Sequence, residues 1–99
     1  AVLRTLNYVV TSVRKMGKPV GVCGELAANP IFAPLLLGMG VTEFSMSANS
    51  VSEIKFLLRK TSFEDARKLR DEVLQMQRSR HIISKLRSFH YESMQPYIP

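Results

Sequence analysis

Apolar residues at the start of the chain recur every three or four positions, which is the spacing of an amphipathic helix. They are Val2, Leu3, Leu6, Val9, Val10, Val13 and Met16. Gly17 follows directly, at the position where a glycine in the left-handed conformation commonly ends a helix. The pattern predicts a helix over residues 2–16 with one buried stripe.

Two short extended segments come next, with a helix between them. Residues 20–24 form a β-branched run with glycines and predict a strand after Pro19. Asn29 and Pro30 have the order of a helix cap and a first-turn proline, so we expect a short apolar helix from there to residues 38–40. The order strand, helix, strand predicts an α/β fold.

The second extended segment, residues 42–46, alternates between apolar and polar side chains. Phe44 and Met46 fall on one side of such a strand, and the polar side chains fall on the other: Glu43, Ser45 and Ser47. The alternation therefore predicts a second strand with one apolar and one polar face.

Helical patterns fill the rest of the chain. Ser50 and Glu53 have capping-box spacing and predict a helix that runs to about residue 60. Ser62 and Asp65 repeat this logic before an apolar face made of Ala66, Leu69, Val73 and Met76. The sequence thus predicts two consecutive helices, each with its own N-terminal cap.

A last helical pattern begins after an expected bend near Ser79, where Arg78 and Arg80 interrupt the apolar stripe. Its apolar residues stand at helical spacing and are Ile82, Ile83, Leu86 and Phe89. We therefore expect a separate basic, helical tail over residues 77–99.

The chain carries a formal net charge of +6, and the excess of basic residues lies in its C-terminal half. Residues 55–99 contain ten basic and five acidic residues, whereas residues 1–54 contain four and three. Because the two signs are interspersed, we interpret the excess as a solvated helical face and expect no nucleic-acid partner. The alternative is a basic helical interaction module over residues 63–95, whose binding to nucleic acid would weaken steeply with salt.

Length and cysteine count narrow the class of protein further. With 99 residues, of which 45% are apolar, the chain is long enough for one small domain. It has one cysteine, no signal-peptide pattern and no apolar run near the roughly 20 residues of a membrane-spanning helix. We expect a cytoplasmic protein without membrane insertion.

The single cysteine, Cys23, lies at the end of the first predicted strand. In parallel α/β proteins the carboxyl ends of the strands form the edge where ligands and reacting groups gather. This placement makes Cys23 the candidate for chemistry. The alternative is a buried cysteine that acts only as a small apolar packing residue.

Three separated blocks around this cysteine resemble one known family. Residues 17–27 read GKPVGVCGELA, residues 34–41 read PLLLGMGV and residues 43–47 read EFSMS. In this order they resemble the C-terminal part of enzyme I, the phosphoenolpyruvate-protein phosphotransferase of the bacterial sugar phosphotransferase system. The resemblance extends over roughly residues 1–76, and we recognise none in residues 77–99.

The resemblance implies a TIM-type (β/α)8 barrel. Such a barrel typically needs about 250 residues, so the two predicted strands would be its last two β/α units, followed by C-terminal helices. A piece of this kind leaves sheet edges and apolar faces uncovered. We therefore expect it to self-associate or to fold only marginally; enzyme I itself is a homodimer joined through this barrel.

The resemblance also implies a reaction. Enzyme I passes the phosphoryl group of phosphoenolpyruvate to its own histidine and on to a phosphocarrier protein, and pyruvate is released. The enolate of pyruvate must gain a proton at its methylene carbon, and the resemblance assigns that role to Cys23. A free thiol holds its proton near neutral pH and can still release it to a carbanion-like carbon.

The two residues after the cysteine are candidate substrate-binding residues. Gly24 would leave room for substrate beside the sulfur. Glu25 has two interpretations: it orients the thiol or a basic group in the pocket, or it pairs with an arginine at the barrel rim. Ser45 and Ser47 could face the substrate phosphate, but helix capping or backbone hydrogen bonding is the favoured use.

Other parts of the family's active site have no counterpart in the sequence. The resemblance implies Mg2+ held by a glutamate and an aspartate of earlier strands, and a phosphorylated histidine in another domain. His81 and His90 match neither, and we interpret them as surface or packing residues. The chain alone is therefore predicted to be inactive. Pyruvate phosphate dikinase and phosphoenolpyruvate synthase remain alternative families, and the sugar-uptake and nitrogen-regulatory branches of enzyme I are not separated by these residues.

Overall fold

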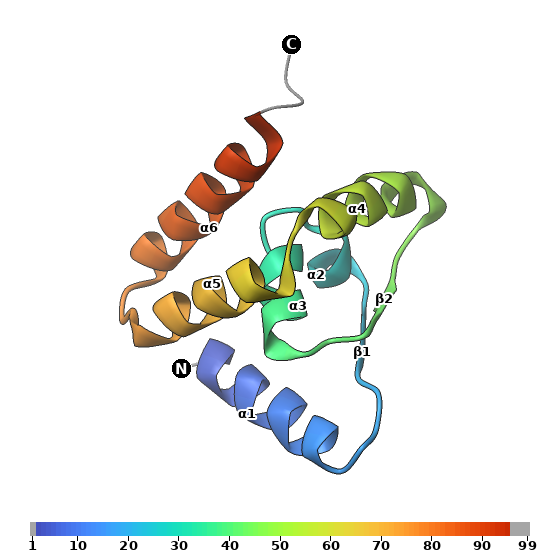
Figure 1. Cartoon of the computed structure of the whole chain (residues 1–99), viewed down its shortest axis with the longest axis vertical. Helices are drawn as coiled ribbons and strands as arrows, with labels where there is room; N and C mark the ends of the chain where they lie inside the picture. The colour runs from blue at the N-terminus through green and yellow to red at the C-terminus, as the bar shows by residue number, and fades with distance from the viewer. Residues whose placement is uncertain (1, 96–99) are drawn as a thin grey trace.

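The computed structural model describes residues 2–95 of the chain. Residue 1, the first of the predicted segment 1–76, and residues 96–99, the last of the predicted segment 77–99, lie outside the described residues. The elements in chain order are α1 (Val2–Lys15), β1 (Gly21–Cys23), α2 (Glu25–Ala28), α3 (Ala33–Met39), β2 (Glu43–Ser45), α4 (Ala48–Lys60), α5 (Phe63–Gln75) and α6 (Ser79–Met94) (Figure 1). Helices dominate, and the strand–helix–strand order predicted from the sequence is confirmed.

The two strands form a parallel sheet whose register is defined by hydrogen bonds at both ends. Val22 lies opposite Phe44 in this register. At the entrance, the Thr42 hydroxyl accepts from the Val20 amide at 3.2 Å, and the Thr42 amide donates to the Val20 carbonyl at 2.9 Å. At the exit, the Gly24 amide donates to the Ser45 carbonyl at 3.1 Å. The strand ends are thus fixed relative to each other.

Several predicted helix boundaries are confirmed. Gly17 follows α1 with φ 76°, the left-handed conformation expected of a terminating glycine. Ser62 caps α5, since its hydroxyl accepts from the Asp65 amide at 3.0 Å. The chain is extended at Met76 and Arg78, which confirms the bend before α6. After this bend α6 turns back to contact both α5 and α4 (Figure 1).

The middle helix begins later than predicted, although Asn29 makes the hydrogen bonds of a cap: its side chain accepts from the Ile31 amide and its carbonyl from the Ala33 amide. The Asn29 side chain accepts from the Ile31 amide at 3.1 Å and forms a tight turn, so Pro30 lies in that turn. The helix begins only at Ala33, and Pro34 takes the first-turn position. A short helix that was not predicted, α2, fills the preceding space. Pro34 has no amide hydrogen to donate to the Pro30 carbonyl, which is a local reason for the regular helix to begin only at Ala33.

The capping box proposed for the next helix is wrong. The helix α4 begins at Ala48, and Ser47 occupies the cap position with extended backbone angles. Ser50 therefore lies in the first turn, where its amide donates to the Ser47 carbonyl at 3.0 Å. The serine spacing alone did not distinguish the two possible caps.

The first helix does not bury the whole stripe that its sequence predicts. Val10 is buried, whereas Val2, Val9 and Met16 are exposed by half or more of their surface. Within the described residues α1 packs mainly on α3. Too little of the chain lies beside α1 to cover its apolar side.

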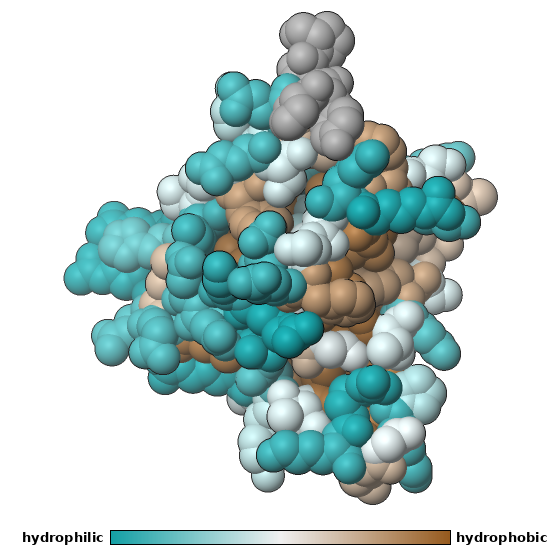
Figure 2. Space-filling view, viewed as in Figure 1, coloured by the Kyte–Doolittle hydropathy of each residue, from teal (hydrophilic) through white to brown (hydrophobic). Residues whose placement is uncertain are grey.

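The core lies between α1, α3, α5 and α6. Its buried residues are Val10, Leu35, Leu36, Met39, Val41, Leu69, Val73 and Leu86. A smaller cluster under α4 contains Ala33, Ile54 and Leu57. In Figure 2 hydrophobic atoms show in the middle of the visible face, while hydrophilic side chains gather on the side where α5 and α6 lie. Within residues 2–95 no helix has both the length and the apolar composition needed to cross a membrane.

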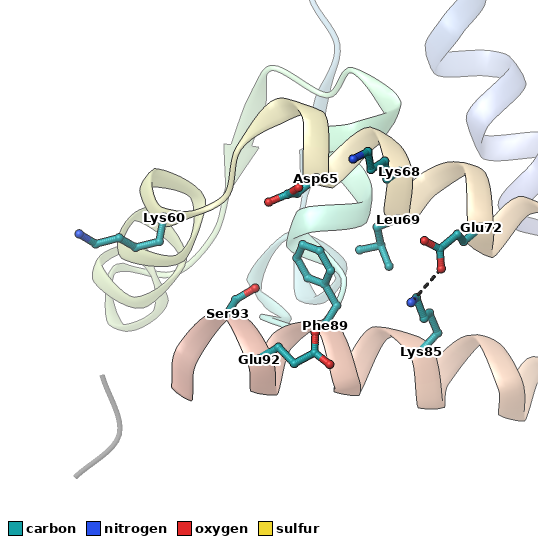
Figure 3. A pocket seen from close by; sticks show the side chains of 9 residues that line it. All are labelled: Lys60, Asp65, Lys68, Leu69, Glu72, Lys85, Phe89, Glu92 and Ser93. Atoms are coloured by element: carbon teal, nitrogen blue, oxygen red, sulfur yellow. Dashed lines mark ion pairs between the residues drawn. The ribbon is translucent and has the colours of Figure 1, made fainter. Parts of the chain in front are cut away.

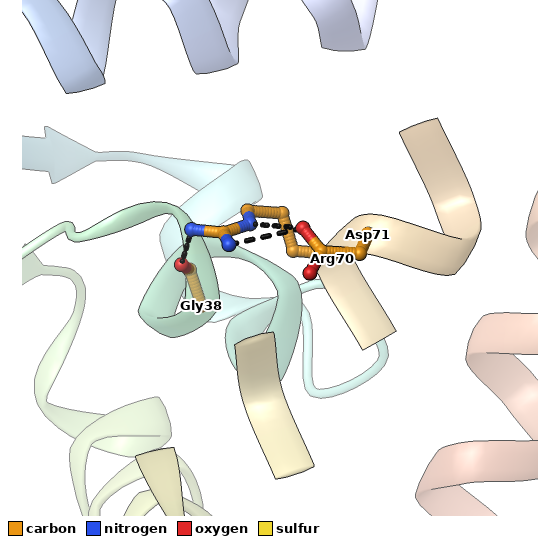
Figure 4. A network of polar contacts seen from close by, with 3 residues as sticks. All are labelled: Gly38, Arg70 and Asp71. Atoms are coloured by element: carbon orange, nitrogen blue, oxygen red, sulfur yellow. Dashed lines mark hydrogen bonds and ion pairs between the residues drawn. The ribbon is translucent and has the colours of Figure 1, made fainter. Parts of the chain in front are cut away.

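The closest helix contact joins α3 to α5. A Cβ atom on Gly38 would lie 2.2 Å from the backbone oxygen of Ala66, so only a glycine permits this approach. The Arg70 guanidinium donates to the Gly38 carbonyl at 2.9 Å and pairs with Asp71 at 2.9 Å (Figure 4). This arginine satisfies a carbonyl near the end of α3, which the helix itself leaves open.

Candidate functional site

Both strands end at the same edge of the sheet, and each ends in a small polar residue. Cys23 is the last residue of β1, and Ser45 is the last residue of β2. The register places them directly opposite each other. Because the strands are parallel, this edge is the carboxyl edge, where the sequence predicts the site.

The two faces of the sheet differ in character. Val22 and Phe44 pack against the core. Side chains alternate along a strand, so Cys23 and Ser45 lie on the opposite face. Both are exposed, and Cys23 is a free thiol. Within residues 2–95 nothing buries Cys23, so the alternative of a buried packing residue does not fit this chain, and its role in chemistry stays a prediction.

The backbone conformation at position 24 requires a glycine. Its φ of 81° and ψ of −152° fall in a region that is essentially restricted to glycine. A Cβ atom at this position would meet nothing within 4 Å, so there is open space beside the residue. Gly24 also accepts from the Ala28 amide at 3.2 Å and thereby starts α2 directly after the thiol.

Glu25 is exposed in the first turn of α2. It forms no ion pair with an arginine of residues 2–95. The two interpretations of Glu25, an orienting group in the pocket or a partner for a rim arginine, therefore both stay predictions.

Glu43 adds a carboxylate to the same face as Cys23 and Ser45. Its sequence pattern alone did not indicate a site residue. It lies opposite Gly21, and its Oε2 atom would be 3.4 Å from a Cβ at that glycine. The absence of a side chain at Gly21 lets the carboxylate lie over the strand. This pair lies two residues before Cys23 and Ser45 along the strands, a distance of roughly 6.5 Å. Only the register between the strands reveals this arrangement.

Of the other predicted polar residues, only Ser45 lies beside Cys23. Ser45 is within β2 and is not a helix cap, whereas Ser47 holds the cap position of α4 without a side-chain hydrogen bond. His81 is exposed and His90 is half-buried, both on α6. The histidines are thus surface and packing residues, as interpreted from the sequence.

A groove lies between α5 and α6 (Figure 3). It has a volume of about 420 Å3 and contains Leu69 and Phe89 among side chains of both signs. Lys85 and Glu72 pair across it at 2.8 Å. The groove contains none of Cys23, Gly24 and Glu25, and its mixed charges do not favour an anion or a cation.

The Mg2+ implied by the resemblance has no matching set of ligands here. Among residues 2–95 no three histidine, cysteine, aspartate or glutamate side chains lie close enough together to hold a metal ion.

Known proteins similar to this chain belong to the family that the three sequence blocks resemble. The chain is 38% identical over 84 residues to a phosphoenolpyruvate-protein phosphotransferase of Geobacillus stearothermophilus, which covers 85% of this chain and 14% of the relative. It is 42% identical over 89 residues to the protein of the same name from Buchnera aphidicola subsp. Acyrthosiphon pisum, covering 90% of this chain and 16% of the relative.

A third relative extends the similarity into the tail. The phosphoenolpyruvate-protein phosphotransferase of Haemophilus influenzae is 42% identical over 93 residues, covering 94% of this chain and 16% of the relative. A match of this length cannot fit within residues 1–76, so the similarity extends into residues 77–99, where the sequence alone showed no resemblance. The chain spans about one sixth of the length of these curated relatives.

The family model that matches the chain is described as PEP-utilising enzyme, PEP-binding domain, where PEP is phosphoenolpyruvate. The match covers residues 1–63 and therefore includes both strands and the Cys23 edge. A match over more than half of the chain shows that this protein belongs to the PEP-binding domain family of the PEP-utilising enzymes.

Proposed function

We propose that this chain is the part of a phosphoenolpyruvate-protein phosphotransferase that supplies the proton donor, Cys23. The single observation that carries the proposal is the exposed thiol at the carboxyl edge of the parallel sheet, within the segment that matches the PEP-binding domain. The names of the relatives support the same reaction class. The complete enzyme would pass the phosphoryl group from phosphoenolpyruvate to a histidine and on to a phosphocarrier protein.

The proposed step at Cys23 is a proton transfer to carbon. Transfer of the phosphoryl group breaks the P–O bond of phosphoenolpyruvate and leaves the enolate of pyruvate. The S–H bond of Cys23 then breaks as a C–H bond forms at the methylene carbon, and a thiolate remains. Because Cys23 is exposed, the thiolate regains a proton from solvent. In the reverse direction the thiolate removes a proton from the methyl group of pyruvate.

We also propose that the two strands are the last two of a TIM-type barrel. In such a barrel helices cover the outer face of the strands and side chains fill the inside. Here the core covers the Val22 and Phe44 face, while the face with Cys23 and Ser45 is open. This asymmetry supports an arrangement in which Cys23 points toward a barrel interior that the rest of the enzyme completes.

The proposal assigns the other catalytic parts to the remainder of a longer enzyme. These are the phosphorylated histidine, the ligands of Mg2+ and the residues that hold the substrate phosphate. The isolated chain is accordingly expected to transfer no phosphoryl group. A cytoplasmic location and a homodimer are further parts of this proposal, because the resemblance implies both.

Exposed apolar side chains support self-association of the chain when it is separated from such an enzyme. Val2, Tyr8 and Val9 on α1 are 81%, 73% and 50% exposed, and each strand of the sheet has one edge unpaired within residues 2–95. We expect sedimentation velocity to show dimers or larger species as concentration rises. A monomer at every concentration with cooperative melting would contradict this expectation.

The direct test is Cys23→Ser in the full-length enzyme that contains this chain. The two side chains are similar in size, but a hydroxyl is a much weaker acid than a thiol, so protonation of the enolate should slow. We expect pyruvate formation to fall by at least tenfold, with little change in affinity for phosphoenolpyruvate. Ser88→Ala, on the exposed surface of α6, is the matched control and should behave as the wild type. Wild-type turnover in Cys23→Ser would remove Cys23 from the mechanism.

A further inference from the structure

Ser45 is the nearest polar neighbour of Cys23 by strand register, and this placement carries an inference that rests on the proposed function. The Cα atoms of the two residues are register partners. Neighbouring strands lie about 4.8 Å apart, and side chains at the same register point to the same face. A hydroxyl and a thiol placed in this way can meet by rotation of their χ1 angles alone.

Both side chains are available for such a contact. Each is exposed, and neither makes a side-chain hydrogen bond to another described residue. Their backbones, in contrast, are held together, because the Gly24 amide donates to the Ser45 carbonyl at 3.1 Å. The backbone is therefore fixed while the two side chains are free to turn toward each other or toward a ligand.

We propose that Ser45 is a positioning residue for Cys23, whose hydroxyl donates a hydrogen bond to the thiolate formed when the proton has moved to carbon. Before the transfer the sulfur holds its proton, and the hydroxyl helps to orient it. During the transfer the S–H bond breaks and negative charge develops on sulfur, which the Ser45 O–H group stabilises. The hydroxyl keeps its own proton throughout, so no additional reactant is needed.

Glu43 cannot take the same role, although it lies on the same face. It lies two register positions farther from the sulfur, opposite Gly21. An ionised carboxylate accepts hydrogen bonds and donates none, and its negative charge would oppose a thiolate. A neutral hydroxyl at Ser45 is the group on this face that can stabilise the charged sulfur.

The test compares Ser45→Ala with Ser45→Thr in the full-length enzyme that contains this chain. Threonine keeps a hydroxyl at the same position, whereas alanine removes it. The first measurement is the rate of Cys23 alkylation by iodoacetamide as a function of pH, with Cys23→Ser as the blank for other thiols. We expect the midpoint of the profile to move to higher pH in Ser45→Ala and to stay near the wild-type value in Ser45→Thr.

The second measurement is steady-state pyruvate formation. We expect kcat to fall about tenfold in Ser45→Ala with KM for phosphoenolpyruvate nearly unchanged, and Ser45→Thr to retain most of the activity. If Ser45 had a purely structural role, the alkylation midpoint would not move, and the ratio of kcat between Ser45→Thr and Ser45→Ala would stay near one. An unchanged alkylation profile in Ser45→Ala would overturn the inference.

The outcomes separate this inference from the proposed function. Slow turnover in Cys23→Ser together with an unchanged profile in Ser45→Ala contradicts only the role of Ser45. Wild-type turnover in Cys23→Ser contradicts the proposed function, and the role of Ser45 in catalysis falls with it.

Discussion

Two regions of this molecule require glycine for opposite reasons. At the contact between α3 and α5, Gly38 leaves space, because a Cβ atom there would lie 2.2 Å from the Ala66 carbonyl oxygen. At the strand ends, Gly24 has open space around it but adopts a φ of 81° that side chains rarely tolerate. The first glycine allows close packing, and the second turns the backbone directly after Cys23.

The comparison shows how stability and chemistry are separated in the fold. The α3–α5 contact is buried and closed, whereas the strand ends are held by backbone hydrogen bonds and present exposed side chains. Side chains at the strand ends are therefore free to change without loss of packing. Mutations in the two regions should affect different properties.

The largest effect is expected from Gly38→Ala. The new Cβ would collide with backbone, which cannot rotate away as a side chain can, so α3 and α5 must separate. Overpacking of this kind costs about 3 kcal/mol of the free energy of unfolding. Chemical denaturation followed by circular dichroism measures the loss, and a value near zero would show that the helices separate without cost.

A smaller loss is expected from Gly24→Ala, about 1–2 kcal/mol from backbone strain alone. Gly24→Asn should give no recovery, since a ψ of −152° lies outside the left-handed helical region that asparagine tolerates. The same denaturation experiment tests both variants. Greater stability of the asparagine variant would indicate that the turn relaxes into another conformation.

Arg70→Met tests the polar part of the α3–α5 contact. The change removes the bond to the Gly38 carbonyl and the pair with Asp71, and we expect a loss of about 1 kcal/mol. Lys68→Met on the same helix is the control, because its pair with Glu64 is exposed and contributes less. Equal losses in the two variants would mean that the arginine's bond to α3 has no special importance.

Cys23→Ser should have the smallest effect on stability, within about 0.5 kcal/mol, because the side chain is exposed and similar in volume. For Cys23→Ser we expect a large loss of activity in the full-length enzyme and almost no loss of stability, whereas Gly38→Ala should lower stability. A marked destabilisation would place Cys23 among the structural residues.

Local signals in the sequence were sufficient where a single hydrogen bond decides the structure. The cap at Ser62 and the left-handed Gly17 were predicted because each depends only on neighbouring residues. The start of α3 was not, since both Asn29-Pro30 and Pro34 satisfy the local rule. Pro34 lacks the amide that would continue a helix from Asn29, so the regular helix begins only at Ala33.

At the candidate site, some features follow from neighbouring residues and others from contacts between distant segments. The position of Cys23 at a strand end follows from the β-branched run before it and from the family resemblance. The pairing of Cys23 with Ser45, and of Gly21 with Glu43, depends on the register between strands 22 positions apart in the sequence. Register is a long-range property, so a single sequence reveals the residues of this face but not which of them are neighbours.

The measurement that tests the central claim most directly is exchange of the methyl hydrogens of pyruvate with deuterated solvent, catalysed by the full-length enzyme. This exchange isolates the proton transfer from the overall turnover and from phosphocarrier binding. If Cys23 carries the proton, exchange should be lost in Cys23→Ser while the enzyme remains folded and Ser88→Ala exchanges at the wild-type rate. Exchange at the wild-type rate in Cys23→Ser would show that another group protonates the enolate.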